Sequence, residues 1–269
     1  MVLRDAFRIS DRCTHLKGNG GSKHAVRQLQ TALPEYRFVF RTDVKSFYAS
    51  IDHLTVYEQL CERITDKGIR RLLWQYLRRT VEHGGLFRDV EKGISLGCPL
   101  SPLIGAISLM PVDELLTDDN LFYVRFMDDW VVLAKTRRNL RRAVKQTNQL
   151  LSTLKLEKHP DKTFIGLIEK GFDFLGYRFS HNGLRIAQTT LTNFYRKAAR
   201  PFLYQQWEQS PSAPEGAERV GRYVKRWSIW SHAGLVVSQR LTSTDVVVEA
   251  GEMHMIFMER IPVADFPEY

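Results

Sequence analysis

The sequence predicts an α+β fold in which helices back an antiparallel sheet. Apolar and β-branched residues concentrate in short runs at 36–44 and 121–134, which is typical of strands. Helical spacing of apolar residues fills 54–81, 102–116 and 137–156. Hydrophobic residues make up 43% of the 269 positions, which is enough for a sizeable packed core.

The elements of the N-terminal half follow from local signals. Residues 24–33 have helical spacing, and Pro34 ends that helix. Residues 36–44 alternate as a strand that ends near Asp43. Residues 84–99 are rich in glycine, which predicts a loop or a short hairpin.

The segment 121–134 predicts two strands joined by a turn at Asp128 and Asp129. Residues 163–168 and 172–179 predict two further strands.

The C-terminal part begins with a helix near Thr190. Residues 210–217 are rich in Ser and Pro and predict a linker. A basic helix with tryptophans follows over 218–233, and the tail 235–269 carries no recognisable motif.

The net charge of +9 indicates an anionic partner, most commonly nucleic acid.

Cys13, Cys61 and Cys98 form no C-x-x-C pair, which argues against zinc ribbons and a disulfide framework and fits a reducing compartment. No signal peptide is visible, and no apolar run approaches the ~18–20 residues of a membrane span. We therefore expect a soluble, cytoplasmic protein without a membrane partner.

Three aspartates form the candidate catalytic group. Asp43 ends one predicted strand, and Asp128 and Asp129 lie between two others, so the carboxylates converge if the strands are neighbours. Mg²⁺ prefers hard oxygen ligands, and phosphoryl transfer depends on such ions. An isolated Asp-Asp pair is more often a solvated turn, but apolar strands on both sides place this pair at the rim of a core.

Five motifs then resemble one family, in order and over about residues 35–180. They are TDVKSFYASIDH, GISLGCPLSPLIGAISL, YVRFMDDWVVLA, LEKHPDKTFIG and GFDFLGYRFS. Together they resemble reverse transcriptases, particularly the group II intron-like bacterial branch. The resemblance implies the palm of a right-hand polymerase.

The resemblance also implies a domain order. Residues 1–35 would be a remnant of the fingers, 36–182 the palm and 183–234 thumb-like basic helices, with 235–269 unassigned. Only 42 residues precede Asp43, whereas the family carries a longer finger region. Either the fingers are truncated, a partner supplies them, or the protein is no longer a polymerase.

The resemblance implies catalytic roles for four side chains. Asp43, Asp128 and Asp129, with the backbone carbonyl of Val44, would hold two Mg²⁺ ions, with Mn²⁺ as an alternative. Lys162 would give a proton to the leaving pyrophosphate, although a lone lysine is usually a surface residue.

The same resemblance implies a nucleotide site. Tyr48 would exclude a 2′-hydroxyl and so favour dNTPs. Leu96 and Gly97 occupy the place of the family's Gln-Gly, and Leu96 cannot replace the hydrogen bonds of the glutamine. Ser101 and Pro102 match the Ser-Pro that opens the next helix, with Ser101 as its cap.

Two further groups of residues point to a duplex. The implied primer grip is Phe174, Leu175, Gly176 and Tyr177. Basic residues with helical spacing would contact phosphates, unless they are only solvated faces; they are Arg138, Arg141, Arg142 and Lys145, then Arg222, Lys225 and Arg226.

The sequence thus predicts an RNA-directed DNA polymerase that adds dNTPs to the 3′-hydroxyl of a DNA or RNA primer on an RNA template. One alternative is a truncated, inactive relative that binds nucleic acid or a protein partner. Another is a defence-associated polymerase with unusual priming. The oligomeric state stays open.

Overall fold

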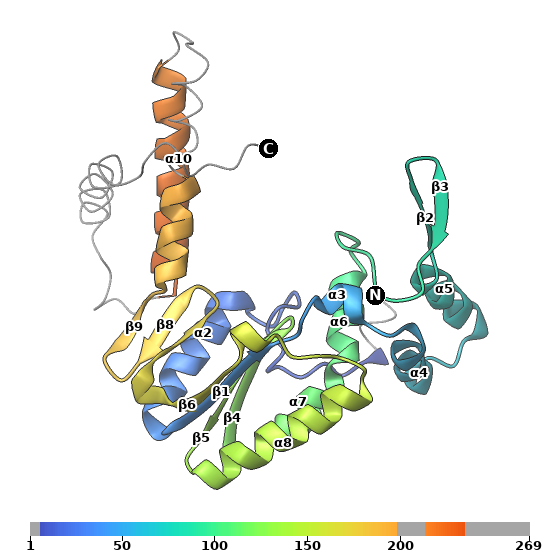
Figure 1. Cartoon of the computed structure of the whole chain (residues 1–269), viewed down its shortest axis with the longest axis horizontal. Coiled ribbons are helices and arrows are strands. Elements are labelled where there is room, and N and C mark those ends of the chain that lie inside the picture. Colours follow the sequence, from blue (N-terminus) through green and yellow to red (C-terminus); the bar gives the residue numbers. More distant parts are fainter. Residues whose placement is uncertain (1–5, 198–212, 235–269) are drawn as a thin grey trace. The chain divides into compact units, whose positions relative to one another are not determined.

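The computed structural model describes residues 6–197 and 213–234 (Figure 1). The chain divides into two compact units, Met1–Gly183 and Leu184–Tyr269. The first unit contains an antiparallel sheet and the helices around it, so the predicted α+β class is confirmed.

The central sheet of the first unit has the strand order β4-β5-β1-β6. Its strands are β4 (Leu121–Phe126), β5 (Asp129–Ala134), β1 (Phe38–Asp43) and β6 (Phe164–Leu167). All three neighbouring pairs are antiparallel. The strands predicted over 36–44, 121–134 and 163–168 are therefore confirmed.

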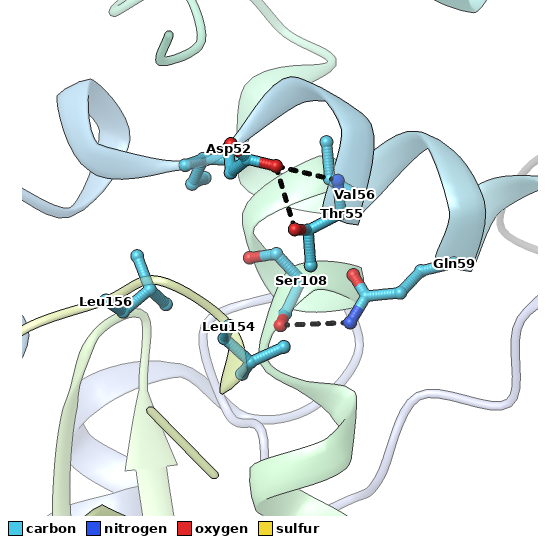
Figure 2. A pocket seen from close by; sticks show the side chains of 8 residues that line it. Asp52, Thr55, Val56, Gln59, Ser108, Leu154 and Leu156 are labelled. Carbon is cyan, nitrogen blue, oxygen red and sulfur yellow. Dashed lines mark hydrogen bonds between the residues drawn. The ribbon is translucent and has the colours of Figure 1, made fainter. Parts of the chain in front are cut away.

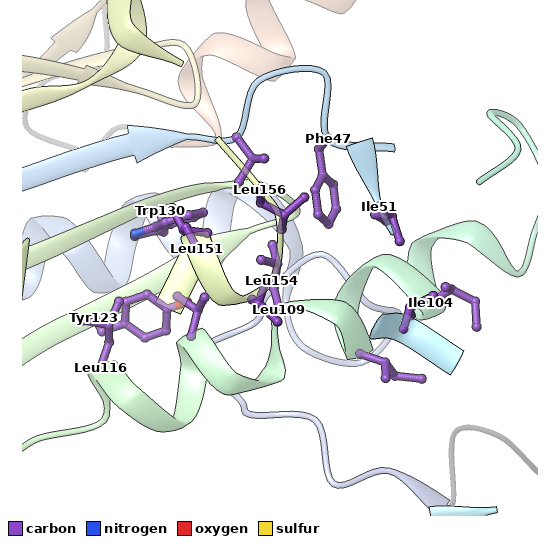
Figure 3. Close-up of a cluster of buried hydrophobic side chains, with 14 of the residues drawn as sticks. Phe47, Ile51, Ile104, Leu109, Leu116, Tyr123, Trp130, Leu151, Leu154 and Leu156 are labelled. Atoms are coloured by element: carbon purple, nitrogen blue, oxygen red, sulfur yellow. The ribbon is translucent and has the colours of Figure 1, made fainter. Parts of the chain in front are cut away.

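Helices α7 (Met110–Leu116) and α8 (Arg137–Thr153) pack against one face of this sheet. That face carries Tyr123 and Trp130, which are 2% and 0% exposed and share one apolar core with Leu151 (Figure 3). Side chains alternate between the two faces of a strand, so Asp129, next to Trp130, lies on the opposite face.

The other elements of the first unit are short. In chain order they are α2 (Gly21–Ala32), η1 (Leu33–Glu35), α3 (Phe47–Ser50), α4 (His53–Arg63), α5 (Lys67–Leu77), β2 (Thr80–His83), β3 (Leu86–Asp89), α6 (Ser101–Ser108), η2 (Pro160–Lys162), η3 (Ile168–Lys170), β7 (Phe172–Phe174) and β8 (Tyr177–Ser180). The predicted helix at 24–33 is confirmed as α2, which begins earlier and packs against β4.

The prediction of continuous helical structure over 54–81 is wrong. Ile64 is extended and ends α4, and the Asp66 side chain starts α5 by accepting a hydrogen bond of 2.8 Å from the Ile69 N–H. Such a cap satisfies a backbone donor that a helix terminus leaves unpaired. The last residues of the range form β2, whose hairpin with β3 confirms the short hairpin expected near residue 84.

The predicted helix at 102–116 is divided at Leu109, between α6 and α7. Pro111 lies in the first turn of α7, where its missing N–H costs nothing, but it cannot continue a preceding helix. The predicted strand at 172–179 is also divided, because Leu175 and Gly176 form the turn of the β7–β8 hairpin.

A small cavity lies beside α4 and α6 (Figure 2). Its lining includes Asp52, Thr55, Gln59 and Ser108, and its volume is about 10 Å³. The Gln59 amide donates to the Ser108 carbonyl at 3.5 Å. A space of this size holds at most about one water molecule, so it is a detail of packing and no substrate site.

The second unit is mainly helical. After β9 (Gly183–Ile186), a helix spans residues 188–197, and α10 (Ala213–His232) is the last element. Phe194 stacks on Trp227 with ring centroids 4.1 Å apart.

The helices predicted near Thr190 and over 218–233 are therefore confirmed. The linker predicted at 210–217 is wrong for 213–217, which is helical. Residues 210–212 and the tail 235–269 lie outside the described residues. None of the helices among the described residues is long and apolar enough to cross a membrane.

Candidate active site

The register of the central sheet brings the first two aspartates together. Asp43, the last residue of β1, lies directly opposite Asp129, the first residue of β5. Directly opposed residues of an antiparallel pair share a face, with Cβ atoms about 5 Å apart. The two side chains therefore lie side by side on the face away from α7 and α8.

The third aspartate lies in the turn beside them. Phe126 pairs with Asp129, so the turn between β4 and β5 consists of Met127 and Asp128. The predicted Asp128–Asp129 turn is thus wrong by one residue, because Asp129 belongs to the strand. Asp128 stays close to Asp43, since its carbonyl accepts a hydrogen bond of 3.3 Å from the Val44 N–H.

Two basic side chains hold the carboxylates. The Arg41 guanidinium donates to both oxygens of Asp129, at 3.1 and 2.9 Å. The Lys162 ammonium lies 3.1 Å from the Asp43 carboxylate. Arg41 also donates to the Lys162 carbonyl at 3.0 Å, which ties β1 to η2. The structure therefore places Lys162 beside the aspartates, and its role as a proton donor to pyrophosphate stays a prediction.

Burial and the neighbouring carboxylates disfavour the ionisation of Asp128 and Asp129. Burial and the nearby Asp43 raise the pKa of Asp128 above its ordinary value. Burial raises the pKa of Asp129 to about 6, although the bond from Arg41 opposes this shift. Carboxylates that are crowded in this way are stabilised in the charged form by an added cation.

The donor set fits a hard divalent cation in part. Asp43 and Asp128 supply the oxygen ligands that Mg²⁺ prefers, while Asp129 is held by Arg41. No three His, Cys, Asp or Glu side chains among the described residues are grouped closely enough to hold a metal. Metal binding by Asp43, Asp128, Asp129 and the Val44 carbonyl therefore stays a prediction.

Tyr48 lies near the aspartates on the side of α6. Burial, followed by the charge of Asp128, raises the pKa of Tyr48 to about 12. Its backbone carbonyl accepts a 2.7 Å hydrogen bond from Ile94. Gly93 approaches so closely that a Cβ there would lie 2.8 Å from the Tyr48 carbonyl oxygen. Tyr48 is thus fixed to the loop that carries Leu96 and Gly97.

That loop presents Leu96 outward, with 78% of its surface exposed. Gly97 has φ of 80°, a conformation that favours glycine, and open space where a Cβ would be. Both residues are therefore accessible to a substrate, and their nucleotide contacts stay predictions.

Ser101 does not cap α6, contrary to the sequence-based expectation. Its side chain forms no capping hydrogen bond; it donates to the Ser95 carbonyl and lies 2.7 Å from the Tyr76 hydroxyl. With 2% exposure, Ser101 anchors the Leu96 loop from inside. Pro102 lies in the first turn of α6, as predicted.

The implied primer grip is the β7–β8 turn. Leu175 and Gly176 have φ of 48° and 87°, which is typical of a two-residue hairpin turn with both central residues left-handed. Phe174 and Tyr177 are 1% and 0% exposed, so their side chains belong to the core. Within this motif, the turn residues are the ones open to a primer strand.

The predicted basic residues are all exposed. On α8 they lie opposite the buried Leu140, Ala143 and Leu151, and on α10 they occur beside the half-buried Trp227. The exposed residues are Arg138, Arg141, Arg142, Lys145, Arg222, Lys225 and Arg226. Arg142 is bonded to Asp118 at 2.6 Å, which reduces its charge toward a phosphate. Contact with nucleic acid stays a prediction.

Comparison with known proteins identifies this arrangement. Residues 6–179 match the family model described as "Reverse transcriptase (RNA-dependent DNA polymerase)". The chain belongs to the reverse transcriptase family. The match covers more than half of the chain and includes the paired aspartates, Tyr48 and the β7–β8 turn. The central sheet with its backing helices is therefore the palm.

Relatives of this reverse transcriptase-family protein differ greatly in sequence. "Protein YkfC" of Escherichia coli (strain K12) is 26% identical over 195 residues, which cover 58% of this chain and 51% of the relative. The chain thus spans about half the length of that relative.

Solved structures share the fold. A telomerase of Candida albicans in complex with a TWJ fragment of telomeric RNA has a TM-score of 0.55 at 12% identity, covering 93% of this chain and 50% of the telomerase. The apo telomerase of Candida tropicalis has a TM-score of 0.54 at 11% identity, covering 96% and 49%.

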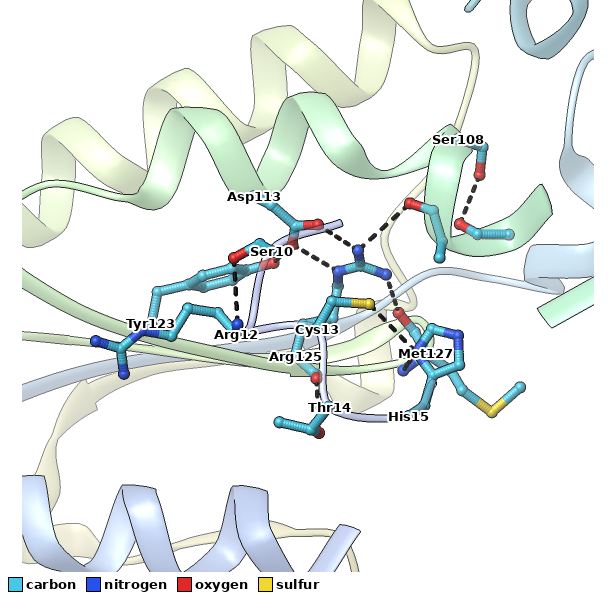
Figure 4. A network of polar contacts seen from close by, with 12 residues as sticks. Ser10, Arg12, Cys13, Thr14, His15, Ser108, Asp113, Tyr123, Arg125 and Met127 are labelled. Carbon is cyan, nitrogen blue, oxygen red and sulfur yellow. Dashed lines mark hydrogen bonds and ion pairs between the residues drawn. The ribbon is translucent and has the colours of Figure 1, made fainter. Parts of the chain in front are cut away.

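Sequence reasoning missed the residues that support the aspartates in this family member. Arg41 precedes Asp43 by two positions, so strand periodicity alone places both on one face. Asp113 and Arg125 were detectable as opposite charges in apolar segments. They form a buried ion pair, with an Nε–Oδ1 distance of 2.8 Å (Figure 4). No local pattern indicates His15, whose Nδ1 accepts a hydrogen bond from the N–H of Met127, the residue before Asp128.

Proposed function

We propose that the chain is an RNA-directed DNA polymerase that adds dNTPs to a primer 3′-hydroxyl. The observation that carries the proposal is the direct cross-strand pairing of Asp43 with Asp129, with Asp128 in the adjoining turn. Because the chain belongs to the reverse transcriptase family, we expect these three aspartates to serve nucleotidyl transfer.

Asp43 and Asp128 would hold the Mg²⁺ ions, with Asp129 and the Val44 carbonyl as further ligands and Mn²⁺ as an alternative. Bound there, the ions lower the pKa of the primer hydroxyl and neutralise developing charge on the phosphates. The hydroxyl would lose its proton to solvent and its oxygen would form a bond to the α-phosphorus. The bond from the α-phosphorus to the oxygen that bridges it to the β-phosphorus would break, and pyrophosphate would leave. Lys162, now paired with Asp43, is exposed enough to turn toward the pyrophosphate and give it a proton.

Tyr48 supports selection of deoxynucleotides. Its ring packs against Phe47, 5.4 Å away by ring centroids, and against Gly105, where a Cβ would lie 3.0 Å from Tyr48. A ring fixed in this way has little freedom to move aside for a 2′-hydroxyl. Tyr48→Ala should therefore raise incorporation of rNTPs, and an unchanged ratio of dNTP to rNTP incorporation would refute the role.

The partners follow from the same proposal. The partners would be an RNA template and a DNA or RNA primer, with the β7–β8 turn against the primer and the exposed basic residues of α10 in contact with phosphates. The basic residues of α8 point away from the sheet and the aspartates, so they would contact phosphates outside the active site. Motif order and spacing support the group II intron-like branch, and the cysteine usage supports a cytoplasmic location. We also propose residues 1–35 as partial fingers, 36–182 as palm and 183–234 as thumb.

The test is primer extension by the purified chain on poly(rA)/oligo(dT) with Mg²⁺ and labelled dTTP. Wild type should extend the primer, and Asp128→Asn should abolish extension. Asp119→Asn is a matched control, because Asp119 is an exposed loop acid away from the site. Absence of extension by wild type on several template–primers would overturn the enzyme proposal and favour a relative that only binds nucleic acid.

A further inference from the structure

The residue before Asp128 has an unusual backbone conformation. Met127 has φ of 58°, in the left-handed region that residues with a Cβ rarely adopt. A turn residue in this state persists only when its surroundings hold it there. Because Met127 directly precedes Asp128, whatever holds Met127 contributes to the position of Asp128, together with the bond from the Val44 N–H to the Asp128 carbonyl.

Both backbone polar groups of Met127 are held by side chains (Figure 4). The Met127 N–H donates to Nδ1 of His15 at 3.1 Å. The Met127 carbonyl accepts from the Arg125 guanidinium at 2.9 Å. Neither bond belongs to the backbone ladder of the hairpin. The Met127 peptide groups therefore cannot rotate without losing two hydrogen bonds.

The geometry fixes the protonation state of His15. Its Nδ1 accepts from a backbone N–H, so that nitrogen carries no proton. The Nε2 then carries the proton and donates to the Pro102 carbonyl at 3.1 Å, at the start of α6. The Cys13 sulfur also lies 3.4 Å from Nδ1. His15 thus connects the Met127 turn to the helix that follows the Leu96 loop.

Arg125 is equally constrained. It is fully buried, and Asp113 of α7 accepts from two of its guanidinium nitrogens. Tyr123 donates to the same carboxylate at 2.7 Å. The planar guanidinium, fixed by this pair, directs its remaining nitrogen at the Met127 carbonyl.

The N-terminal segment delivers His15 to this place. Cys13 pairs with Arg125 in a parallel bridge, and Thr14 donates to the Arg125 carbonyl through its N–H at 2.9 Å and its hydroxyl at 3.0 Å. These bonds attach residues 12–15 to the free edge of β4. A segment so far from the turn in sequence is therefore built into its support.

We propose that His15 and Arg125 are positioning residues that clamp the Met127 backbone and thereby set the metal-binding orientation of Asp128. The catalytic part of this inference rests on the proposed function. The clamp consists of His15, Arg125 and Asp113. Residues 12–15 therefore support the position of Asp128 in the active site, a role different from binding the triphosphate.

Two conservative variants separate the two bonds of His15. In His15→Asn, the side-chain oxygen can occupy the position of Nδ1 and still accept from Met127. In His15→Gln, the amide reaches the position of Nε2 and can donate to Pro102, but the acceptor for Met127 is lost. Both variants keep a polar side chain of similar size, so a general loss of packing affects them alike.

The first measurement is amide exchange in the full chain labelled with ¹⁵N-methionine, with the Met127 signal assigned through Met127→Leu. His15→Gln should speed exchange of the Met127 amide by roughly fivefold to tenfold, the effect of one lost hydrogen bond. His15→Asn should match wild type. Equal exchange in all three proteins would overturn the clamp, whatever the activity.

The second measurement is primer extension. His15→Gln should lower kcat by roughly fivefold to tenfold with a smaller change in the KM for dTTP. The reason is that the Asp128 carboxylate, which His15 positions, acts in the transition state. His15→Asn should restore kcat. Faster amide exchange in His15→Gln with an unchanged kcat would overturn the positioning role.

If wild type extends no primer, the proposed function fails and the positioning role is tested by Mn²⁺ affinity. The titration measures free Mn²⁺ by electron paramagnetic resonance. Weaker binding by His15→Gln than by His15→Asn would support the role. Equal binding by the two variants, or no binding by any protein, would overturn it.

Discussion

Arg41 forms a two-pronged ion pair with Asp129, at 3.1 and 2.9 Å, on the face of the palm sheet that carries Asp43. The pair is mostly buried, with side-chain exposures of 17% and 16%. Arg41 therefore occupies the place where a divalent cation would otherwise neutralise Asp129.

Removal of Arg41 tests whether Asp129 is available to metal. Arg41→Ala leaves Asp129 beside Asp43 and Asp128 without its cation, so the melting temperature should fall in the absence of Mg²⁺. Added Mg²⁺ should raise that temperature more in Arg41→Ala than in wild type, because a ligand of the folded state stabilises it. Differential scanning fluorimetry with and without Mg²⁺ measures this. Equal shifts in the two proteins would show that Asp129 is only the structural partner of Arg41.

Breaking the buried pair of Asp113 and Arg125 should strongly destabilise the palm. Asp113→Ala leaves the guanidinium of Arg125 buried without its anion, which costs about 3–5 kcal/mol. Urea unfolding of the two proteins gives the difference. The matched control is Asp118→Ala, which removes an ion pair with the half-exposed Arg142 and should have a much smaller effect. Similar losses in the two variants would contradict the prediction.

Gly93 should be intolerant of a side chain. It has φ of 85°, and a Cβ would lie 2.8 Å from both the Tyr48 carbonyl oxygen and the Ala49 Cα. Gly93→Ala should therefore destabilise the chain and detach the Leu96 loop from Tyr48. Gly97→Ala is the control, because Gly97 has a similar φ of 80° but open space around it. Thermal unfolding should show a clearly larger loss for Gly93→Ala, and equal losses would mean that backbone strain alone matters.

The exposed basic face of α8 should contribute to the salt dependence of nucleic-acid binding, through contacts outside the active site. Arg138→Ala and Lys145→Ala should each reduce the salt slope of binding to an RNA–DNA duplex by about 1, if each contacts one phosphate. Arg142→Ala should change the slope less, since Arg142 is bonded to Asp118. Fluorescence anisotropy over a range of salt concentrations measures the slopes. Slopes identical to wild type would show that α8 faces solvent.

Asp52 should contribute stability that depends on pH. Burial raises its pKa, but hydrogen bonds from the Thr55 N–H and hydroxyl and the nearby Lys155 outweigh this and hold it at about 2, below the ordinary 3.8. A lowered carboxyl pKa stabilises the folded state above 3.8, and this contribution is lost as the pH falls toward about 2.

The matched variant is Asp52→Asn, which keeps a capping oxygen for α4 and lacks the charge. Its melting temperature should be lower than that of wild type at pH 7, and the gap should close as the pH falls below 4. A constant gap across that range would contradict the role of the Asp52 charge.

Much of the palm was predictable because its signals are local. Alternation along β1 and β5 depends only on which side chains face the core, so the strands follow from the sequence. The convergence of Asp43 with Asp129 was expected only if the two strands are neighbours, which the pairing of β1 with β5 shows. The breaks at Asp66 and Pro111 also have local causes. They were missed because apolar spacing continues across both.

Other features depend on register and could not be obtained from the strand pattern. Asp129 belongs to β5 and not to the turn because it pairs with both Phe126 and Asp43. Ser101 points inward because the Ser95 carbonyl and Tyr76 converge on it. In each case a partner outside the local segment determines the position of the residue.

By itself, the sequence determined the family, the strands and the identity of the three acids, since these follow from short motifs and side-chain periodicity. Only the tertiary structure decided which groups hold those acids. His15 and Met127 are separated by 112 positions, and Arg41 and Asp129 by 88. The physical reason is that a hydrogen bond extends only about 3 Å, so such partners meet only after the whole palm has packed.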